Sequence, residues 1–313
     1  MNHAGLETGG EGPEDSPRQT LSFLLKRFEE TGIRPRTKFG QNFLIDLNLL
    51  DVLLDAADIT RDDVILEVGT GTGSLTARLA QRAAAVVTVE IDASMFQMAA
   101  EQLHAFPNVV QLQADALKNK NRLNPDVLEA VAGQMAAAPG RRFKLVANLP
   151  YGAATPILSN LLAENSPPQS MTVTVQKELA ERIAAAPGGK DYGALSIWMQ
   201  SQCRVEILRT LPPSAFWPRP KVSSAFLQIT PDPSLRGRIS DRRRFHEFVR
   251  AMFLHRRKFL RSELFSVVGD RLDKPAIDAI LRQQGLNGQQ RAESLGVDAM
   301  LSLCEAVHRQ IDG

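Results

Sequence analysis

Residues 64–73 read Val-Ile-Leu-Glu-Val-Gly-Thr-Gly-Thr-Gly, and this stretch decides the fold. An apolar run rich in β-branched residues comes first, three glycines alternate with threonines after it, and residues 74–84 continue with helical spacing. The apolar run predicts a buried strand. Glycines between a strand and a helix allow positive φ and let the backbone come close to a ligand. The stretch therefore predicts the first strand, turn and helix of an α/β sheet, with a ligand at the turn.

The same alternation continues along the chain. Apolar runs that predict strands occupy residues 86–92, 109–115, 144–150 and 171–176, and stretches with helical spacing occupy 93–105, 126–138, 155–164 and 177–186. Strands that alternate with helices indicate βαβ units and a mostly parallel sheet with helices on both faces. Two later runs, 195–208 and 223–230, predict a hairpin at the edge of this sheet, which brings the expected number of strands to seven.

The ends of the chain differ from its centre. Residues 1–19 are rich in Gly, Glu, Pro and Ser, which predicts a disordered tail. Beyond Pro231 and Pro233 the pattern is helical only, at 243–268, 275–284 and 297–311. Helices also precede the sheet at 21–31, with Thr20 as a cap, and at 47–58. We therefore divide the chain into a tail (1–19), a Rossmann-like α/β domain (20–232) and a helical domain (233–313).

Composition excludes several classes of protein. The chain of 313 residues is 43% hydrophobic and 23% charged, which is ordinary for a folded protein. No apolar run approaches the ~18 residues of a membrane span, and the N-terminus does not resemble a signal peptide. Two distant cysteines and five scattered histidines form no disulfide framework and no metal-ligand spacing. We expect a cytoplasmic, monomeric protein that binds neither membrane nor metal.

Charge is unevenly distributed along the chain. Residues 204–261 contain 14 Lys and Arg against four acids, a local charge of +10, while the whole chain carries only +2. A basic block on a nearly neutral protein indicates a polyanion such as nucleic acid, although a solvated face would have the same composition. The segment 255–261, His-Arg-Arg-Lys-Phe-Leu-Arg, mixes cations with apolar residues as an amphipathic helix does.

The glycine turn is followed by acids at the ends of the next two strands. It does not match the dinucleotide pattern GxGxxG, because Ser74 stands at the last glycine position, and it lacks the GK[ST] of a phosphate-binding loop. Glu90 could accept both hydroxyls of a ribose, and Asp115 could accept a hydrogen bond from an adenine amine. Each feature alone could be a simple turn or a helix cap. Together with Gly69 they predict a pocket for S-adenosylmethionine.

Residues 148–151, Asn-Leu-Pro-Tyr, end the fourth strand beside this pocket. The side-chain oxygen of Asn148 and the backbone carbonyl of Pro150 could accept the two N–H bonds of an exocyclic adenine amine. Holding those hydrogens favours a pyramidal nitrogen with an available lone pair, which a delocalised amine otherwise lacks. Tyr151 offers a ring to stack on the base. The motif therefore predicts transfer of a methyl group to adenine.

At this point the chain resembles a known family, the ribosomal RNA adenine N6,N6-dimethyltransferases, and within it the small-subunit type. The resemblance extends from about residue 34 to about residue 303. The motifs that carry it occur in order: KFGQNFL (38–44), EVG (67–69), VEID (89–92), DAL (115–117), NLPY (148–151), QKE (176–178), YGALS (192–196), PPSAF (212–216), Pro218 with PKV (220–222), RRK (256–258) and RAE (291–293).

The resemblance implies a role for each site. It implies that Asn42 and Leu44 close over the cofactor, that Gly69, Glu90 and Asp115 bind it, and that Asn148 and Tyr151 hold the base. Further, it implies that Phe216 stacks on the other face of the base. The implied substrate is a pair of adjacent adenines in the 3′-terminal hairpin loop of small-subunit (16S) ribosomal RNA. In that case Arg256, Arg257 and Lys258 would contact the RNA phosphates.

Some residues depart from the family's pattern, and two alternatives remain open. Gly152 follows Tyr151 where the family often has Asn, and residues 118–141 are longer and richer in Ala than expected, which suggests an extra surface helix. A large-subunit enzyme of the macrolide-resistance type would tend to carry Ile in place of Leu149. A ribosome-assembly or transcription factor without catalysis would keep the fold but need no intact NLPY motif.

Overall fold

The computed structural model describes residues 21–35 and 40–313. The predicted disordered tail, the cap at Thr20 and the first two residues of the KFGQNFL motif lie outside the described residues. Among the described residues, no helix combines the length and the apolar character that a membrane span requires.

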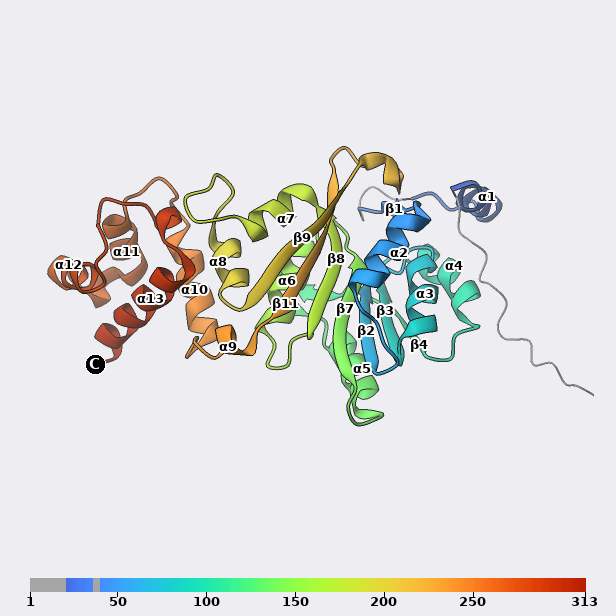
Figure 1. Cartoon of the computed structure of the whole chain (residues 1–313), viewed down its shortest axis with the longest axis horizontal. Helices are drawn as coiled ribbons and strands as arrows, with labels where there is room; N and C mark the ends of the chain where they lie inside the picture. The colour runs from blue at the N-terminus through green and yellow to red at the C-terminus, as the bar shows by residue number, and fades with distance from the viewer. Residues whose placement is uncertain (1–20, 36–39) are drawn as a thin grey trace, which may run out of the picture.

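A seven-stranded sheet forms the centre of the molecule (Figure 1), in the order β4-β3-β2-β7-β8-β11-β9. Five neighbouring strands, β4 to β8 in that order, are parallel, whereas β11 is antiparallel to both of its neighbours. The predicted mostly parallel sheet and its edge hairpin are confirmed. The strands are β2 (Asp63–Val68), β3 (Ala85–Glu90), β4 (Val109–Gln113), β7 (Arg142–Asn148), β8 (Ser170–Gln176), β9 (Cys203–Leu211) and β11 (Ser224–Pro231).

Helices cover both faces of the sheet because its central strands are apolar on both sides. Along β2, Val64 and Leu66 belong to one buried cluster and Ile65 to another, as the alternation of side chains in a strand requires. One face carries α2 (Leu47–Ala56) and α3 (Ser74–Arg82), with α4 (Ala93–Leu103) beside α3; the other carries α5 (Pro125–Ala136), α6 (Ala154–Ala163), α7 (Lys177–Ala184) and α8 (Ala194–Gln200).

Two short strand pairs lie outside the main sheet. One joins β1 (Phe43–Leu44) to β10 (Phe216–Trp217), and it brings the N-terminal segment against the loop before β11. The other is a small hairpin of β5 (Leu117–Asn119) and β6 (Arg122–Leu123). Helix α1 (Leu21–Thr31) covers the first pair, where Phe28, Phe43 and Trp217 form an aromatic cluster.

Two sequence predictions about helices are wrong. The sequence predicts one strand at 195–208, but the first half of this run forms α8 and only its second half belongs to β9. A short apolar run has no period that separates a buried helix from a buried strand, and residues 196–199 are all buried. The segment 118–141 is not an extra surface helix, because Val127 and Val131 of α5 are buried in the core under the sheet.

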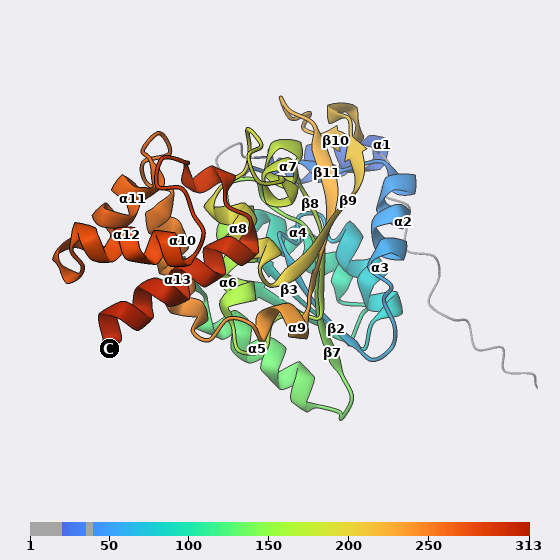
Figure 2. The same cartoon turned by 60° about the vertical axis from the view of Figure 1, so that its left-hand side comes forward.

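Beyond β11 the chain is helical, and the helices that follow Asp241 gather at one end of the molecule (Figure 2). The helices beyond β11 are α9 (Pro233–Arg236), α10 (Arg242–Met252), α11 (Leu260–Val268), α12 (Lys274–Gln283) and α13 (Val297–Asp312). The predicted helix 243–268 is broken between Met252 and Leu260. The backbone N–H of His255 in this break donates to the buried carboxylate of Glu263, 3.3 Å away. The cations at 256–258 therefore lie in a turn, not on an amphipathic helix.

The helical end is not separate from the core of the sheet. His246 of α10 stacks on the buried Trp198 of α8, with ring centroids 4.2 Å apart, and burial lowers the pKa of His246 to about 4. One hydrophobic cluster continues from the sheet through α8 into α10–α13. The division of the chain into domains at residues 232 and 233 stays a prediction.

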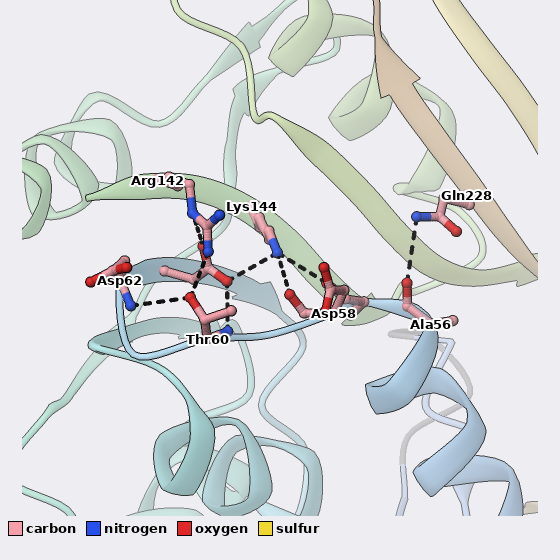
Figure 3. Close-up of polar contacts among 9 residues, drawn as sticks. Ala56, Asp58, Thr60, Asp62, Arg142, Lys144 and Gln228 are labelled. Carbon is pink, nitrogen blue, oxygen red and sulfur yellow. Dashed lines mark hydrogen bonds and ion pairs between the residues drawn. The ribbon is translucent and has the colours of Figure 1, made fainter. Parts of the chain in front are cut away.

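An ion-pair cluster closes the edge of the sheet where β2 and β7 begin (Figure 3). Asp63 is fully buried, and Arg142 and Lys144 each approach one of its carboxylate oxygens to 2.9 Å. The ammonium of Lys144 also donates to the carbonyls of Ala57 and Asp58. Because each buried charge has a partner, the cluster ties the loop after α2 to both strands, and removal of one partner would cost about 3–5 kcal/mol.

Candidate functional site

A cavity of about 470 Å³ opens at the carboxyl ends of the parallel strands, where α/β folds bind their ligands. It collects most of the residues that the sequence singles out. The predicted site residues on its wall are Asn42, Gly69, Glu90, Asp115, Asn148, Pro150 and Tyr151. They come from the segment before β1 and from the ends of β2, β3, β4 and β7, so the topology brings together residues as distant in sequence as Asn42 and Asn148, which are 106 positions apart.

The glycine turn is held by Glu90. The backbone N–H of Gly71 donates to one carboxylate oxygen of Glu90 and that of Asp92 to the other, each at 2.9 Å. Gly69, Gly71 and Gly73 all have positive φ, which explains the glycines. Burial raises the pKa of Glu90 above its ordinary value. Each oxygen of Glu90 keeps a second lone pair for a ligand hydroxyl.

A second acid, Glu67, lies under the turn and is almost completely buried. The hydroxyls of Thr76 and Thr88 both donate to its Oε2, at 2.6 and 2.7 Å, and Thr88 also bonds Thr70 of the turn at 2.7 Å. Burial raises the pKa of Glu67 to about 8, so its carboxyl group is mostly neutral at pH 7. A neutral acid thus supports the turn from below, while Glu90 faces the cavity.

The donor and acceptor groups of the cavity fit S-adenosylmethionine. Asp115 is exposed and, among the described residues, uses only Oδ1, which accepts from the backbone of Leu117 at 2.9 Å. Its other oxygen is therefore available to an adenine amine. Ile91 lines the cavity with 45% of its surface exposed, an apolar face next to the acid that would hold a ribose. Acids for the hydroxyls and the amine and an apolar wall for the purine suit an adenosine.

Asn148 is oriented by the segment before β1. Its amide nitrogen donates to the backbone carbonyl of Asn42 at 2.8 Å, so the amide oxygen Oδ1 remains to accept a hydrogen bond from a ligand. In the described part of the chain no donor bonds this Oδ1, and Asn148 lines the cavity. Asn42 thus contributes its carbonyl, while its side chain bonds Gly40 at 3.1 Å. The arrangement presents an acceptor to the cavity, as the amine hypothesis requires.

The structure changes the role that the sequence predicts for Pro150. Its carbonyl accepts from the backbone N–H groups of Ala153 at 2.9 Å and Ala154 at 3.1 Å, which start α6. Both lone pairs are therefore in use, and no lone pair remains for an amine. Leu149 also lines the cavity, and its carbonyl has no partner among the described residues. Of these two carbonyls, that of Leu149 is therefore the one that could still accept from an amine.

Tyr151 lies on the cavity wall and is held by its hydroxyl, which bonds Ser224 Oγ at 2.6 Å. Ser224 is buried at the start of β11, so this bond ties the ring to the antiparallel part of the sheet. Burial raises the pKa of Tyr151, which keeps the hydroxyl neutral and available for that bond. The anchored ring offers its face to a planar base.

Leu44 and Phe216 do not line the cavity. They pair with each other between β1 and β10 and belong to the core around α2. Phe216 is only 2% exposed. The structure therefore does not place Phe216 against a base or Leu44 against a cofactor; both pack in the core around α2 instead. Sequence proximity to the motifs could not separate these roles, because burial depends on the β1–β10 pairing.

Comparison with known proteins identifies the family. A sequence model of the ribosomal RNA adenine dimethylase family matches residues 32–307. The chain belongs to this family. It therefore uses S-adenosylmethionine to methylate adenine in ribosomal RNA, and the resemblance seen in the sequence is confirmed. "Ribosomal RNA small subunit methyltransferase A" of Caldanaerobacter subterraneus subsp. tengcongensis is 39% identical over 88% of this chain and 98% of its own. The protein of the same name in Shouchella clausii is 36% identical over 94% and 95%.

Two solved structures share the fold. A dimethyladenosine transferase from Plasmodium falciparum has a TM-score of 0.67 at 23% identity, covering 84% of this chain and 96% of its own. The 23S rRNA methyltransferase ErmE has a TM-score of 0.58, also at 23% identity, covering 85% of this chain and 100% of its own. Likeness at this level of identity shows the fold alone. It confirms the α/β sheet with C-terminal helices, and it does not distinguish between small-subunit and large-subunit ribosomal RNA as the substrate.

The basic turn at 256–258 lies away from the cavity and is partly neutralised. Arg256 donates to the carboxylate of Glu293 at 2.6 Å, and Lys258 bonds Ser266 at 3.3 Å. Arg257 is exposed and has no such partner in the described structure. Elsewhere in the basic block, cations pair with acids of α12 and α13, such as Asp278 and Asp298. In the folded structure these ion pairs therefore offset part of the charge of +10 that residues 204–261 carry.

Several residues of the site were not found from the sequence. Ile91, Lys120 and Gln41 line the cavity, and Phe43 packs on the glycine turn so closely that a Cβ on Gly71 would lie 2.9 Å from its ring. An apolar residue directly after the Glu90 carboxylate was a signal that could have indicated Ile91. No group of three or more acids, histidines or cysteines is placed to hold a metal ion in the part of the chain that the structure describes.

Proposed function

We propose that the chain dimethylates N6 of two adjacent adenines in the 3′-terminal hairpin loop of small-subunit ribosomal RNA. The curated relatives named above are small-subunit methyltransferases, which supports the subunit. The observation that carries the chemistry is the orientation of Asn148, whose Nδ2 is bound to Asn42 so that Oδ1 faces the cavity without a donor. The cytoplasmic location and the monomeric state stay predictions.

The protein acts on the amine by accepting its hydrogens. Asn148 Oδ1 and the Leu149 carbonyl each accept a hydrogen bond from one N–H of the exocyclic nitrogen, and this favours a pyramidal nitrogen whose lone pair is less delocalised into the ring. Tyr151, fixed by Ser224, stacks on the base and keeps its plane constant. These contacts position the nitrogen for in-line attack, and alignment of this kind supplies a large part of a rate acceleration.

S-Adenosylmethionine supplies a methyl group on a sulfonium, which needs little activation. The residues that would hold it are Glu90 for the ribose hydroxyls, Asp115 for the adenine amine and Ile91 for the purine face. Glu90 would bind the ribose without a change in its own charge. The hydrogen bonds that it accepts from the backbone of Gly71 and Asp92 hold its carboxylate in position. No strong base is required at Asn148, since the nitrogen becomes acidic once it is alkylated.

The target adenine must leave its stack to reach the cavity. Exposed cations of the helical end, among them Arg257 and Lys258, would position the RNA through phosphates without reading bases. Arg256 is already bonded to Glu293, so its contribution is to the shape of the turn. The affinity for RNA should therefore depend on the salt concentration, whereas the reaction itself should depend on the residues of the cavity.

The test is methyl transfer with labelled S-adenosylmethionine to unmethylated small subunits and to unmethylated large-subunit RNA. We expect label in two adjacent adenines near the 3′ end of the small-subunit RNA, located by mass mapping of nuclease fragments. Label in large-subunit RNA alone would instead support the macrolide-resistance type. Cofactor binding by calorimetry without transfer to either RNA would support a non-catalytic assembly factor.

A further inference from the structure

The β5–β6 hairpin lies at the rim of the cavity, and its cations are not used by the site described above. Residues 117–123 read Leu-Lys-Asn-Lys-Asn-Arg-Leu, three cations without an acid. Lys118, Lys120 and Arg122 are all exposed, and Lys120 lines the cavity that also holds Asn148 and Tyr151. The β5–β6 hairpin therefore places positive charge at the edge of the reaction site.

Hydrogen bonds hold the hairpin in place. Asn124 donates from its backbone to the carbonyl of Ala116 and from its side chain to that of Asp115, each at 2.9 Å. At the tip, Asn119 Oδ1 accepts from the backbone of Asn121 at 2.9 Å. The side chain of Asn160 on α6 donates to the carbonyl of Lys120 at 3.3 Å. Both the base and the tip of the hairpin are thus anchored, so the backbone that carries the three cations is held beside the cavity.

The hairpin cations differ from most of the basic block because nothing neutralises them. In the described residues, no carboxylate lies within ion-pair distance of Lys118, Lys120 or Arg122. The nearest acids in sequence are placed elsewhere: Asp115 accepts from the backbone of Leu117, and Asp126 lies in the first turn of α5. Among the described residues that line the cavity, Lys120 is the one cation, and its hairpin brings two more cations close to the rim.

We propose that the β5–β6 tip is a second phosphate-binding surface for the substrate RNA, next to the nucleotide that enters the cavity. The proposal rests on the proposed function. Three cations on one short hairpin suit a backbone of several phosphates better than a single small anion, and S-adenosylmethionine carries no phosphate for them to bind. The contact carries no sequence information; it holds the strand beside the extruded adenine.

The test uses the full chain and a transcript of the 3′-terminal hairpin of small-subunit RNA, with binding followed by fluorescence anisotropy between ~0.05 and ~0.3 M KCl. The variant is Lys118→Ala with Arg122→Ala, which leaves Lys120 and the cavity wall unchanged. Each phosphate contact contributes about 0.7 to the slope of log K against log salt on single-stranded RNA. We expect the slope to fall by about 1.4 and the affinity at ~0.1 M salt to fall about 10- to 30-fold.

Arg61→Ala is the matched control, because Arg61 is an exposed cation in the loop before β2, at the opposite edge of the sheet. It should leave slope and affinity within about twofold of the wild type. An unchanged slope in the double variant overturns the proposal, as does weaker S-adenosylmethionine binding with unchanged RNA binding. If the double variant fails to fold, Lys118→Gln and Arg122→Gln are each tested alone against the same criterion, with half the slope change expected.

The two proposals fail in distinguishable ways. A wild-type chain that does not methylate small-subunit RNA contradicts the proposed function. A wild-type chain that methylates it, while the double variant binds the RNA with the same salt dependence, contradicts only the role of the hairpin.

Discussion

Glu67→Gln tests whether a neutral acid supports the glycine turn. Burial raises the pKa of Glu67 from its ordinary value of 4.5 to about 8. This difference corresponds to about 5 kcal/mol, since each tenfold change in acidity is worth about 1.4 kcal/mol. Glutamine keeps the shape and an oxygen for the hydroxyls of Thr76 and Thr88 but does not titrate.

The direction in which stability changes with pH follows from the number of protons that the folded and the unfolded chain bind. Below pH 4.5 the carboxyl is protonated in both the folded and the unfolded chain, so it causes no pH dependence. Above pH 4.5 the unfolded chain ionises while the folded chain keeps its proton up to about pH 8. The unfolded state therefore binds fewer protons, and stability falls as pH rises through this window. Between pH 5 and pH 8 the loss is about 3 kcal/mol.

The assay is urea unfolding of the wild type and of Glu67→Gln at several pH values from 5 to 8. The free energy of unfolding of the wild type, minus that of the variant, should fall by about 3 kcal/mol across this range. Glu129→Gln, which changes an exposed acid on α5, should show no such trend. A difference between wild type and Glu67→Gln that is flat with pH would refute the argument from burial.

Three further predictions concern the target-base side of the cavity. Asn148→Ala should lower kcat about 100- to 1,000-fold while calorimetric binding of S-adenosylmethionine is kept, and retained turnover would contradict the amine argument. Ser224→Ala and Tyr151→Phe should each cost about 1 kcal/mol in urea unfolding, and the double variant should cost little more than either alone, because they remove the same bond. A fully additive cycle would count against that bond. Phe216→Ala should lower the free energy of unfolding by about 3–5 kcal/mol, because the ring is buried; loss of activity at unchanged stability would instead place the ring against the base.

The sequence by itself determined the order of strands and helices and the chemistry of the cavity. Apolar runs between glycine turns and helical stretches are local patterns, so the parallel strands were predicted within a few residues. Because parallel strands end at one edge, Gly69, Glu90, Asp115 and Asn148 could be assigned to one pocket from their places after successive strands.

Only the tertiary structure decided how neighbouring groups use their bonds and charges. Pro150 and Leu149 are adjacent in sequence, yet the start of α6 occupies the carbonyl of Pro150, while that of Leu149 has no partner among the described residues. Phe216 became part of the core because β10 pairs with β1. In the basic block at 204–261, several cations form ion pairs with acids that come later in the chain. The cations of the β5–β6 hairpin form no such pairs among the described residues. Burial, hydrogen-bond saturation and charge pairing depend on residues far apart in sequence, and local patterns do not contain them.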